Sequence, residues 1–187
     1  AATFSTAASS VPSGGVKIQY RFSNSSAKPW SGPDFSTRFL SDGGQSGRGP
    51  ILAADSRKEP QKWKYVTDKP GDDWTTLEFN DRGWPKGDGG FGQRGTPGSV
   101  VRTNWTSSDI WLRRVFTIDH LPDRAILNIQ HDEEATIYIN GQKAAHLAGF
   151  STASPDYTNH AIDTGLLKKG DNLIAIRCHQ TDGGQFI

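Results

Sequence analysis

The sequence predicts an all-β protein, an antiparallel β-sandwich of the jelly-roll type, and three observations lead to this prediction. Apolar and polar residues alternate with a period of two in several short segments, as they do in strands with one buried face. Gly, Pro, Asn and Asp recur between these segments, where they are typical of turns. Only residues 164–169 show a helical pattern, which allows one or two turns.

The chain divides by composition into a polar start and an aromatic-rich remainder. Residues 1–50 are rich in Ser, Gly and Ala, and one alternating run there, Val16, Ile18, Tyr20 and Phe22, suits a single half-buried strand. We interpret this part as a linker that could carry one added strand. Trp and Phe residues then arrive between Asp, Gly and Pro turns, which predicts a folded domain over residues 51–187.

The strands of that domain follow from the alternation. In residues 109–118 one side is more apolar and is predicted to be buried; it holds Leu112, Phe116 and Ile118. The next strands are expected at residues 126–129 and 135–139, and the second of these has one apolar side with Ala135, Ile137 and Ile139.

Turn residues define the end of the domain. Asn140-Gly141 predicts a type I′ hairpin, because both residues tolerate the positive φ angles that this turn needs. The short helical segment could begin with Thr164 as its N-cap and stop at Gly170. A last alternating strand follows over residues 173–178.

Several of these segments form an ordered set of motifs, which are Trp74-x4-Phe79-Asn80-Asp81-x2-Trp84-Pro85, then residues 109–116, 135–141 and 170–176, and the ending Gln180-Thr181-Asp182-Gly183-Gly184-Gln185. The set resembles the galactose-binding-like, sugar-binding domain of β-galactosidase-type glycoside hydrolases of family two. It is still more similar to the stand-alone version appended to bacterial polysaccharide-degrading enzymes. The resemblance covers roughly residues 60 to 187, and the family pattern continues past Ile187, which suggests a part of a longer protein.

The resemblance implies a domain without catalytic carboxylates. In β-galactosidase two of its loops reach into the active site of a neighbouring barrel and contact the sugar. By motif position, those contacts fall on Asn104 and Asp182. The resemblance therefore implies a non-catalytic chain with two sugar-contacting loops.

The run His131, Asp132 and Glu133 permits three interpretations. The residues could form a turn or hydrogen-bond at a sheet edge, they could bind sugar hydroxyls, or they could bind calcium. They do not form a glycosidase acid pair, because neighbouring residues on an extended chain point to opposite faces. They also lack the ligand spacing of known zinc or calcium sites, so no cofactor is expected and calcium is the weakest alternative.

The other candidate residues lie near strand ends, where the loops of a sandwich gather. His179, Gln180 and Asp182 follow the last strand, and their polar groups suit either sugar hydroxyls or loop-stabilising hydrogen bonds. Asp109 begins the long strand. Trp105 lies in a polar loop, where an exposed indole could stack on a sugar ring, although Trp is also a common core residue.

Composition argues against several other classes of protein. With 21 basic and 20 acidic residues the net charge is +1, so nothing points to nucleic acid or an anionic membrane as a partner. There is no apolar run of about 20 residues, the length that spans a bilayer. Residues 90–95 match G-x-G-x-x-G, but no helix start follows, so a surface loop is predicted instead of a nucleotide site. The single Cys178 is expected to pack as a small hydrophobe.

Together these observations predict a non-catalytic, extracellular or periplasmic module that binds carbohydrate or flanks the active site of a polysaccharide-degrading glycoside hydrolase. The absence of Met, position 1 included, fits a processed secreted protein or an excised piece. The expected partners are an oligo- or polysaccharide and a catalytic domain of the same parent chain. One alternative is a structural domain that docks against a catalytic domain without a ligand of its own, and another is an adhesion sandwich with a protein partner.

Overall fold

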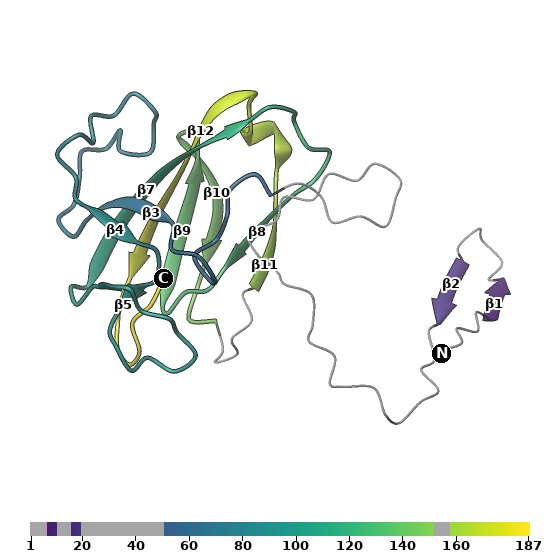
Figure 1. Cartoon of the computed structure of the whole chain (residues 1–187), viewed down its shortest axis with the longest axis horizontal. Coiled ribbons are helices and arrows are strands. Elements are labelled where there is room, and N and C mark those ends of the chain that lie inside the picture. The colour runs from purple at the N-terminus through teal and green to yellow at the C-terminus, as the bar shows by residue number, and fades with distance from the viewer. Residues whose placement is uncertain (1–6, 11–15, 20–50, 152–157) are drawn as a thin grey trace. The chain divides into compact units, whose positions relative to one another are not determined.

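The computed structural model describes residues 7–10, 16–19, 51–151 and 158–187 (Figure 1). The chain forms two compact units, Ala1–Asp34 and Phe35–Ile187. In the first unit, β1 (Ala7–Ser10) pairs antiparallel with β2 (Val16–Gln19). The start of the predicted alternating run lies in β2, whereas Tyr20 and Phe22 lie outside the described residues.

The second unit contains a six-stranded antiparallel sheet in the order β10-β9-β12-β7-β3-β4. Its strands are β3 (Lys62–Val66), β4 (Lys86–Asp88), β7 (Asp109–Ile118), β9 (Glu134–Ile139), β10 (Gln142–Leu147) and β12 (Gly170–His179). The last strand in sequence, β12, lies near the middle, between β7 and β9. Residues far apart in the chain therefore meet at the ends of the central strands.

A second layer faces this sheet. β8 (Ala125–Ile129) pairs antiparallel with β11 (Thr158–Ile162), and β5 (Phe91–Gly92) pairs parallel with β6 (Thr103–Asn104). Phe186 forms antiparallel bridges with both Gly92 and Asp132, so it links the two halves of this layer. The all-β sandwich predicted from the sequence is confirmed.

A short 3-10 helix, η1 (Thr164–Leu166), precedes β12, and its N-cap is Asp163 instead of the predicted Thr164. The Asp163 side chain accepts a hydrogen bond from the Gly165 amide at 2.9 Å, which is the usual role of an N-cap side chain. None of the helices in the described residues has the length and apolar character that crossing a bilayer requires.

The main core lies between the two layers. The residues of the predicted apolar sides of β7 and β9 are all buried there, namely Leu112, Phe116, Ile118, Ala135, Ile137 and Ile139. Ile174, Ile176 and Cys178 of β12 are buried in the same core. Ile110 is also fully buried in this core. Since β-strand side chains alternate, the neighbouring residues of the same strands face the other side of the large sheet.

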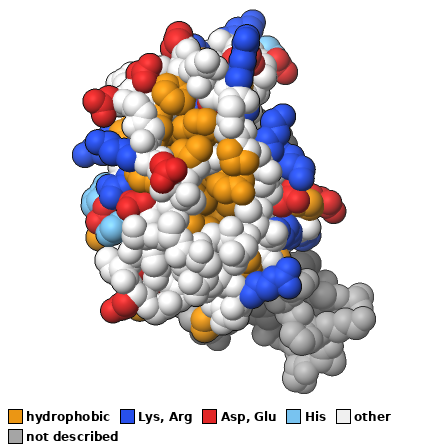
Figure 2. Space-filling view, turned by 90° about the vertical axis from the view of Figure 1, so that its left-hand side faces the viewer, with side chains coloured by type: hydrophobic (Ala, Val, Ile, Leu, Met, Phe, Trp, Pro, Cys, Tyr) orange, Lys and Arg blue, Asp and Glu red, His pale blue; other side chains and the backbone are white. Residues whose placement is uncertain are grey.

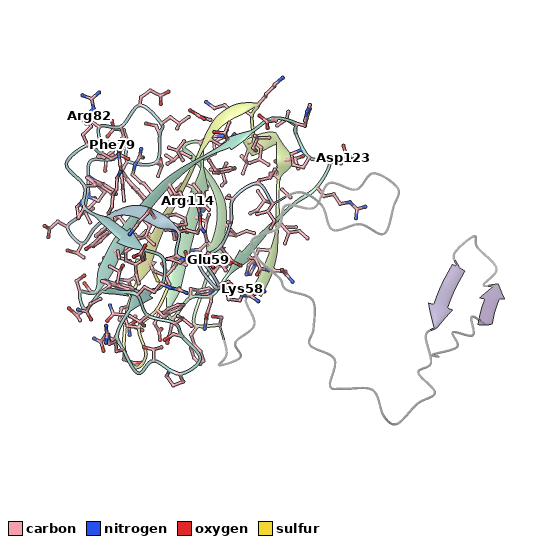
Figure 3. The ribbon with its side chains drawn as sticks, in the orientation of Figure 1. Lys58, Glu59, Phe79, Arg82, Arg114 and Asp123 are labelled. Atoms are coloured by element: carbon pink, nitrogen blue, oxygen red, sulfur yellow. The ribbon has the colours of Figure 1, made fainter. Side chains whose placement is uncertain are left out.

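That other side is largely covered as well. Trp74 and Trp111 pack with Leu173 and Ala175 in a second core cluster. The segment between β3 and β4 supplies much of this cover, and Phe79 and Arg82 of that segment are labelled in Figure 3. Apolar residues on both faces explain why β12 is a nearly continuous apolar run.

The Asn140-Gly141 turn joins β9 to β10 as predicted, with φ angles of 49° and 86°. The prediction for residues 90–95 was wrong in its first half. Phe91 and Gly92 form the buried strand β5, and a Cβ on Gly92 would lie 2.1 Å from the Gln185 carbonyl oxygen. The glycine at this position therefore serves a close approach of two backbones, a role that the sequence pattern alone does not indicate.

Candidate functional site

Residues from three separate segments meet at one end of the sandwich. We call this group the rim, and it consists of Asn104, Asp109, His131, Asp132, Glu133, His179, Gln180 and Asp182. Backbone hydrogen bonds hold the segments together: the Gln180 amide donates to the Ser108 carbonyl at 2.7 Å, and the Asp132 amide donates to the Phe186 carbonyl at 2.8 Å. The structure thus brings the predicted loops to one end of the molecule.

Asn104 belongs to the same end. The amide of the next residue, Trp105, donates to the Gly92 carbonyl at 3.0 Å, and Gln93 donates to the Gln185 carbonyl at 3.0 Å. The short β6 is thereby tied to the chain that follows Asp182. The Asn104 side chain is exposed there.

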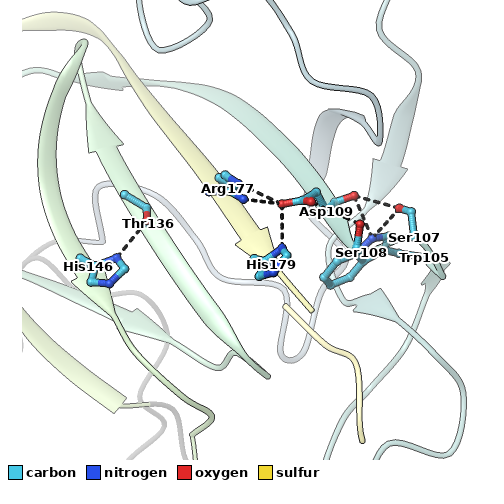
Figure 4. A network of polar contacts seen from close by, with 8 residues as sticks. All are labelled: Trp105, Ser107, Ser108, Asp109, Thr136, His146, Arg177 and His179. Carbon is cyan, nitrogen blue, oxygen red and sulfur yellow. Dashed lines mark hydrogen bonds and ion pairs between the residues drawn. The ribbon is translucent and has the colours of Figure 1, made fainter. Parts of the chain in front are cut away.

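Asp109 organises the charged part of the rim (Figure 4). Its Oδ1 accepts hydrogen bonds from Arg177 Nε at 2.9 Å and lies 3.1 Å from His179 Nδ1. Arg177 Nη2 is 2.8 Å from the same oxygen. The Arg177 and His179 side chains are 41% and 36% exposed, against 19% for Asp109. The carboxylate therefore positions two side chains that solvent or a ligand can reach.

Trp105 does not form an exposed platform, so that expectation is wrong. Its side chain is 2% exposed. The indole Nε1 donates to Ser107 Oγ at 2.9 Å and to the Asp109 carbonyl at 3.1 Å. The polar surroundings that suggested exposure in the sequence instead supply the acceptors that a buried indole N–H requires.

His131 is also a structural residue, since it is only 5% exposed. Its Nδ1 lies 2.5 Å from the Glu133 carbonyl oxygen, and its amide donates to Ser151 Oγ at 3.0 Å. The imidazole thereby holds the turn between β8 and β9. This arrangement presents Asp132 and Glu133, and not His131 itself, toward the end of β12.

The acidic groups of the rim influence one another. Burial raises the pKa of Asp132, and the charges of Glu133 and Asp182 raise it further, while His131 opposes them. Glu133 Oε2 accepts a hydrogen bond from Thr181 Oγ1 at 2.7 Å. In the described part of the chain no group of three or more His, Cys, Asp or Glu side chains is arranged to hold a metal ion.

The glycine-rich ending makes room for these carboxylates. A Cβ on Gly184 would lie 2.4 Å from Asp132 Oδ2, so any other residue here would require the Asp132 carboxylate to move. Gln180 Nε2 donates to the Asp182 carbonyl at 2.6 Å, whereas Gln180 Oε1 is buried without a hydrogen-bond partner. The Asp182 side chain is exposed. Asp182 and Asn104 are therefore exposed predicted residues of the rim, beside the partly exposed His179.

Sequence reasoning missed three contributors, Arg177, Thr181 and Gln185. Gln185 is 2% exposed, and its Nε2 donates to the Ser107 carbonyl at 2.6 Å, which fixes the loop before Asp109. Arg177 could have been found from its place two residues before His179, because residues two apart on a strand share a face.

No protein-family model matches this chain. No curated protein matches it either. Among solved structures, the chain is similar to a β-glucuronidase from glycoside hydrolase family 2, with 20% identity and a TM-score of 0.47 over 65% of this chain and 13% of that one. It is also similar to a β-glycosidase from Bacteroides vulgatus, with 18% identity and a TM-score of 0.45 over 68% of this chain and 18% of that one. A third structure, a glycosyl hydrolase family 2 member from Bacteroides cellulosilyticus, has 18% identity and a TM-score of 0.47 over 68% of this chain and 19% of that one. This chain thus spans less than a fifth of the length of each of these structures.

Proposed function

We propose that this chain is a non-catalytic module that binds carbohydrate, or flanks the active site, in a polysaccharide-degrading glycoside hydrolase. The observation that carries the proposal is the convergence of the rim. Asn104, Asp182 and the pair of Arg177 and His179 lie at one end of the sandwich although 78 positions separate the first two in sequence. The order of sequence motifs that resembles sugar-binding sandwiches gives independent support.

The rim offers the chemistry that sugar hydroxyls need. Carboxylates accept hydrogen bonds, the Asn104 amide both donates and accepts, and Arg177 beside the rim donates from a position that Asp109 fixes. Without a stacking platform at Trp105, the binding free energy comes from these polar groups. We therefore expect weak affinity, with a Kd of about 0.1 to 1 mM.

No reaction is assigned to the rim. An oligo- or polysaccharide is the proposed ligand, and a catalytic domain of the same parent chain is the proposed partner. An extracellular or periplasmic location goes with this proposal, since polysaccharides are met there.

The test is a titration of the whole chain against algal and plant oligosaccharides by calorimetry and by NMR. Asp182→Ala and Asn104→Ala change exposed side chains, so they should leave the fold intact and weaken binding at least tenfold, or about 1.4 kcal/mol. Asp123→Ala, in the exposed loop between β7 and β8 (Figure 3), is the matched control and should bind normally. Equal binding by all three variants, or no binding to any sugar, would reject the proposal.

A structural docking domain is the second candidate. Figure 2 shows hydrophobic side chains gathered on one face and framed by charged ones, as expected for a surface that packs against another domain. Under this alternative the chain binds no sugar, and its solubility improves when the neighbouring domain is present. The two candidates are therefore separated by the titration and by coexpression.

A further inference from the structure

The loop that follows β10 lies at the same end of the sandwich as the rim. β9 begins at that end, and because β10 is antiparallel to β9, its last residue, Leu147, lies opposite Ala135 near the start of β9. The chain then turns at Gly149, where φ is 66°. Ser151 next meets the segment that follows β8. Residues 148–151 therefore cross from the large sheet to the second layer at the rim end.

Three hydrogen bonds fix this loop to a residue of the rim. The Ser151 amide donates to the His131 carbonyl at 2.9 Å, and Ser151 Oγ donates to the same carbonyl at 2.7 Å. In return, the His131 amide donates to Ser151 Oγ at 3.0 Å. Since His131 is buried, the backbone beside Phe150 is attached to a well-packed part of the molecule.

Phe150 presents an aromatic ring to solvent at this place. It is 61% exposed, the highest value among the large apolar residues that are exposed in the described part of the chain, and it alone of them is aromatic. The others are Ile51, Val100, Val115 and Leu121. A single exposed apolar residue is common on protein surfaces and needs no function. What distinguishes Phe150 is its attachment to the rim, where the polar candidate residues gather.

Four loops cross between the two layers at the rim end, in the order of the strands that they join. They are residues 148–151 after β10, 130–133 before β9, 180–185 after β12 and 105–108 before β7. Neighbouring strands lie about 4.8 Å apart, so the three steps from β10 to β7 cover about 14 Å. Phe150 belongs to the first loop of this row, Asp182 to the third, and Asn104 directly precedes the last. The row is longer than a single pyranose ring.

We propose that Phe150 is the stacking platform of the site and that the ligand is an oligosaccharide chain lying along the row of loops, with one pyranose ring on Phe150 and another at Asp182 and Asn104. This inference rests on the proposed sugar-binding function and adds the class of ligand to it. A pyranose with equatorial hydroxyls has an apolar face of C–H groups that packs on an aromatic ring, while its hydroxyls need polar partners. The site therefore selects linked sugars over free monosaccharides.

The experiment titrates the full chain with xylotetraose, mannotetraose, cellotetraose and neoagarotetraose, each beside its constituent monosaccharides. At least one tetrasaccharide should bind at least tenfold more tightly than its monosaccharides. Phe150→Ala should weaken tetrasaccharide binding at least tenfold and leave monosaccharide binding unchanged, whereas Phe150→Tyr should bind normally. Leu121→Ala is the matched control, because Leu121 is 56% exposed and follows the opposite end of β7. Because these side chains are exposed, the variants should keep the Tm of the wild type.

NMR spectra of the bound sugar separate stacking from a general apolar contact. The C–H protons on one face of a pyranose should shift upfield on the wild type, and Phe150→Leu, which is apolar but has no ring, should abolish this shift. Equal tetrasaccharide affinity of the wild type and Phe150→Ala, with weaker binding by Asp182→Ala, would overturn this inference and leave the proposed function standing. If no sugar binds to the wild type, both are overturned.

Discussion

Arg113 shows how a single charge is accommodated inside this sandwich. Its side chain is 2% exposed on the outer side of β7, and its Nε donates to Asp81 at 2.9 Å. Its Nη1 donates to the carbonyls of Trp74 and Thr76, and its guanidinium lies 5.2 Å from the centre of the Phe79 ring. One residue thus connects the sheet to the segment that covers it.

Replacing Arg113 should weaken the packing of the segment between β3 and β4 against the sheet. Arg113→Ala is expected to lower the free energy of unfolding by about 3 kcal/mol, because the partly buried Asp81 loses one of its two cationic partners and two carbonyls lose their donor. Arg113→Lys keeps the charge but not the several donors of the guanidinium, so its stability should lie between those of the wild type and Arg113→Ala. Urea denaturation measures both, with Arg82→Ala of the same segment as an exposed control. A loss below about 1 kcal/mol for Arg113→Ala would contradict this account.

Asp81 makes the same contact sensitive to acid. Burial alone would raise its pKa, but hydrogen bonds from Lys64 and Arg113 outweigh burial and lower it. The stability that Asp81 contributes is therefore present above its unfolded pKa of about 3.9 and is lost as pH falls through the lower folded value. Asp81→Asn should flatten the stability curve below about pH 4. Thermal melts of both proteins between pH 2 and 7 measure this effect. The same pH dependence of Tm in Asp81→Asn and in the wild type would contradict it.

Asp132 should behave in the opposite way. Its pKa is raised by burial and by the neighbouring acids, so the charged form costs stability and protonation recovers it as pH falls through the folded pKa. Asp132→Asn is expected to be more stable than the wild type near pH 7 and equal to it near pH 4. Thermal melts between pH 4 and 7 measure this difference in stability, with Asp123→Asn as the control. A less stable variant at pH 7 would show that the carboxylate stabilises the fold.

At the scale of elements, a pair of asparagines joins the β9–β10 hairpin to the start of β12. Asn140 Nδ2 donates to Asn172 Oδ1 at 2.8 Å, and the Asn140 Oδ1 accepts from the Leu173 amide at 2.9 Å. Asn172 is fully buried, and its Nδ2 donates to the carbonyls of Lys168 and Gly170. The turn after η1 and the hairpin are therefore held by one network.

Removing the buried amide should weaken both elements together. Asn172→Ala is expected to cost about 3 kcal/mol, because several backbone groups and Asn140 lose their partners in a dry environment. Lys169→Ala, at an exposed position of the same turn, should change stability by less than about 0.5 kcal/mol. Hydrogen exchange can show whether the hairpin amides of β10 open with the turn. Unchanged protection of these amides in Asn172→Ala would show that the hairpin does not depend on the turn, contrary to this prediction.

Alternation predicted the strands well because it reports burial on each face directly. The inner residues of β7 and β9 were found in this way, whereas the Asn140-Gly141 turn was found from its residue types. The burial of Trp105 was not found, because it depends on Ser107 and on a backbone carbonyl. The strand β5 was missed for a similar reason: its partners, β6 and Phe186, are distant in sequence. Periodicity describes a segment and says little about which distant segment it meets.

At the scale of the whole molecule, Cys178 reports on global unfolding. It is fully buried in β12, and burial raises the pKa of its thiol, so little reactive thiolate forms in the native state. We expect an aromatic disulfide reagent to modify it only after the sheet opens. The free energy obtained from the labelling rate should match that from urea denaturation. Fast labelling under native conditions would indicate local opening of β12.

The position of β12 also has a consequence for synthesis. Because this strand comes last in sequence yet lies between β7 and β9, a nascent chain that has not reached Gly170 presents two open strand edges with apolar faces. Such a chain would be prone to aggregate or to recruit chaperones until β12 has left the ribosome. Premature termination should accordingly be more harmful in this protein than the loss of an edge strand such as β4.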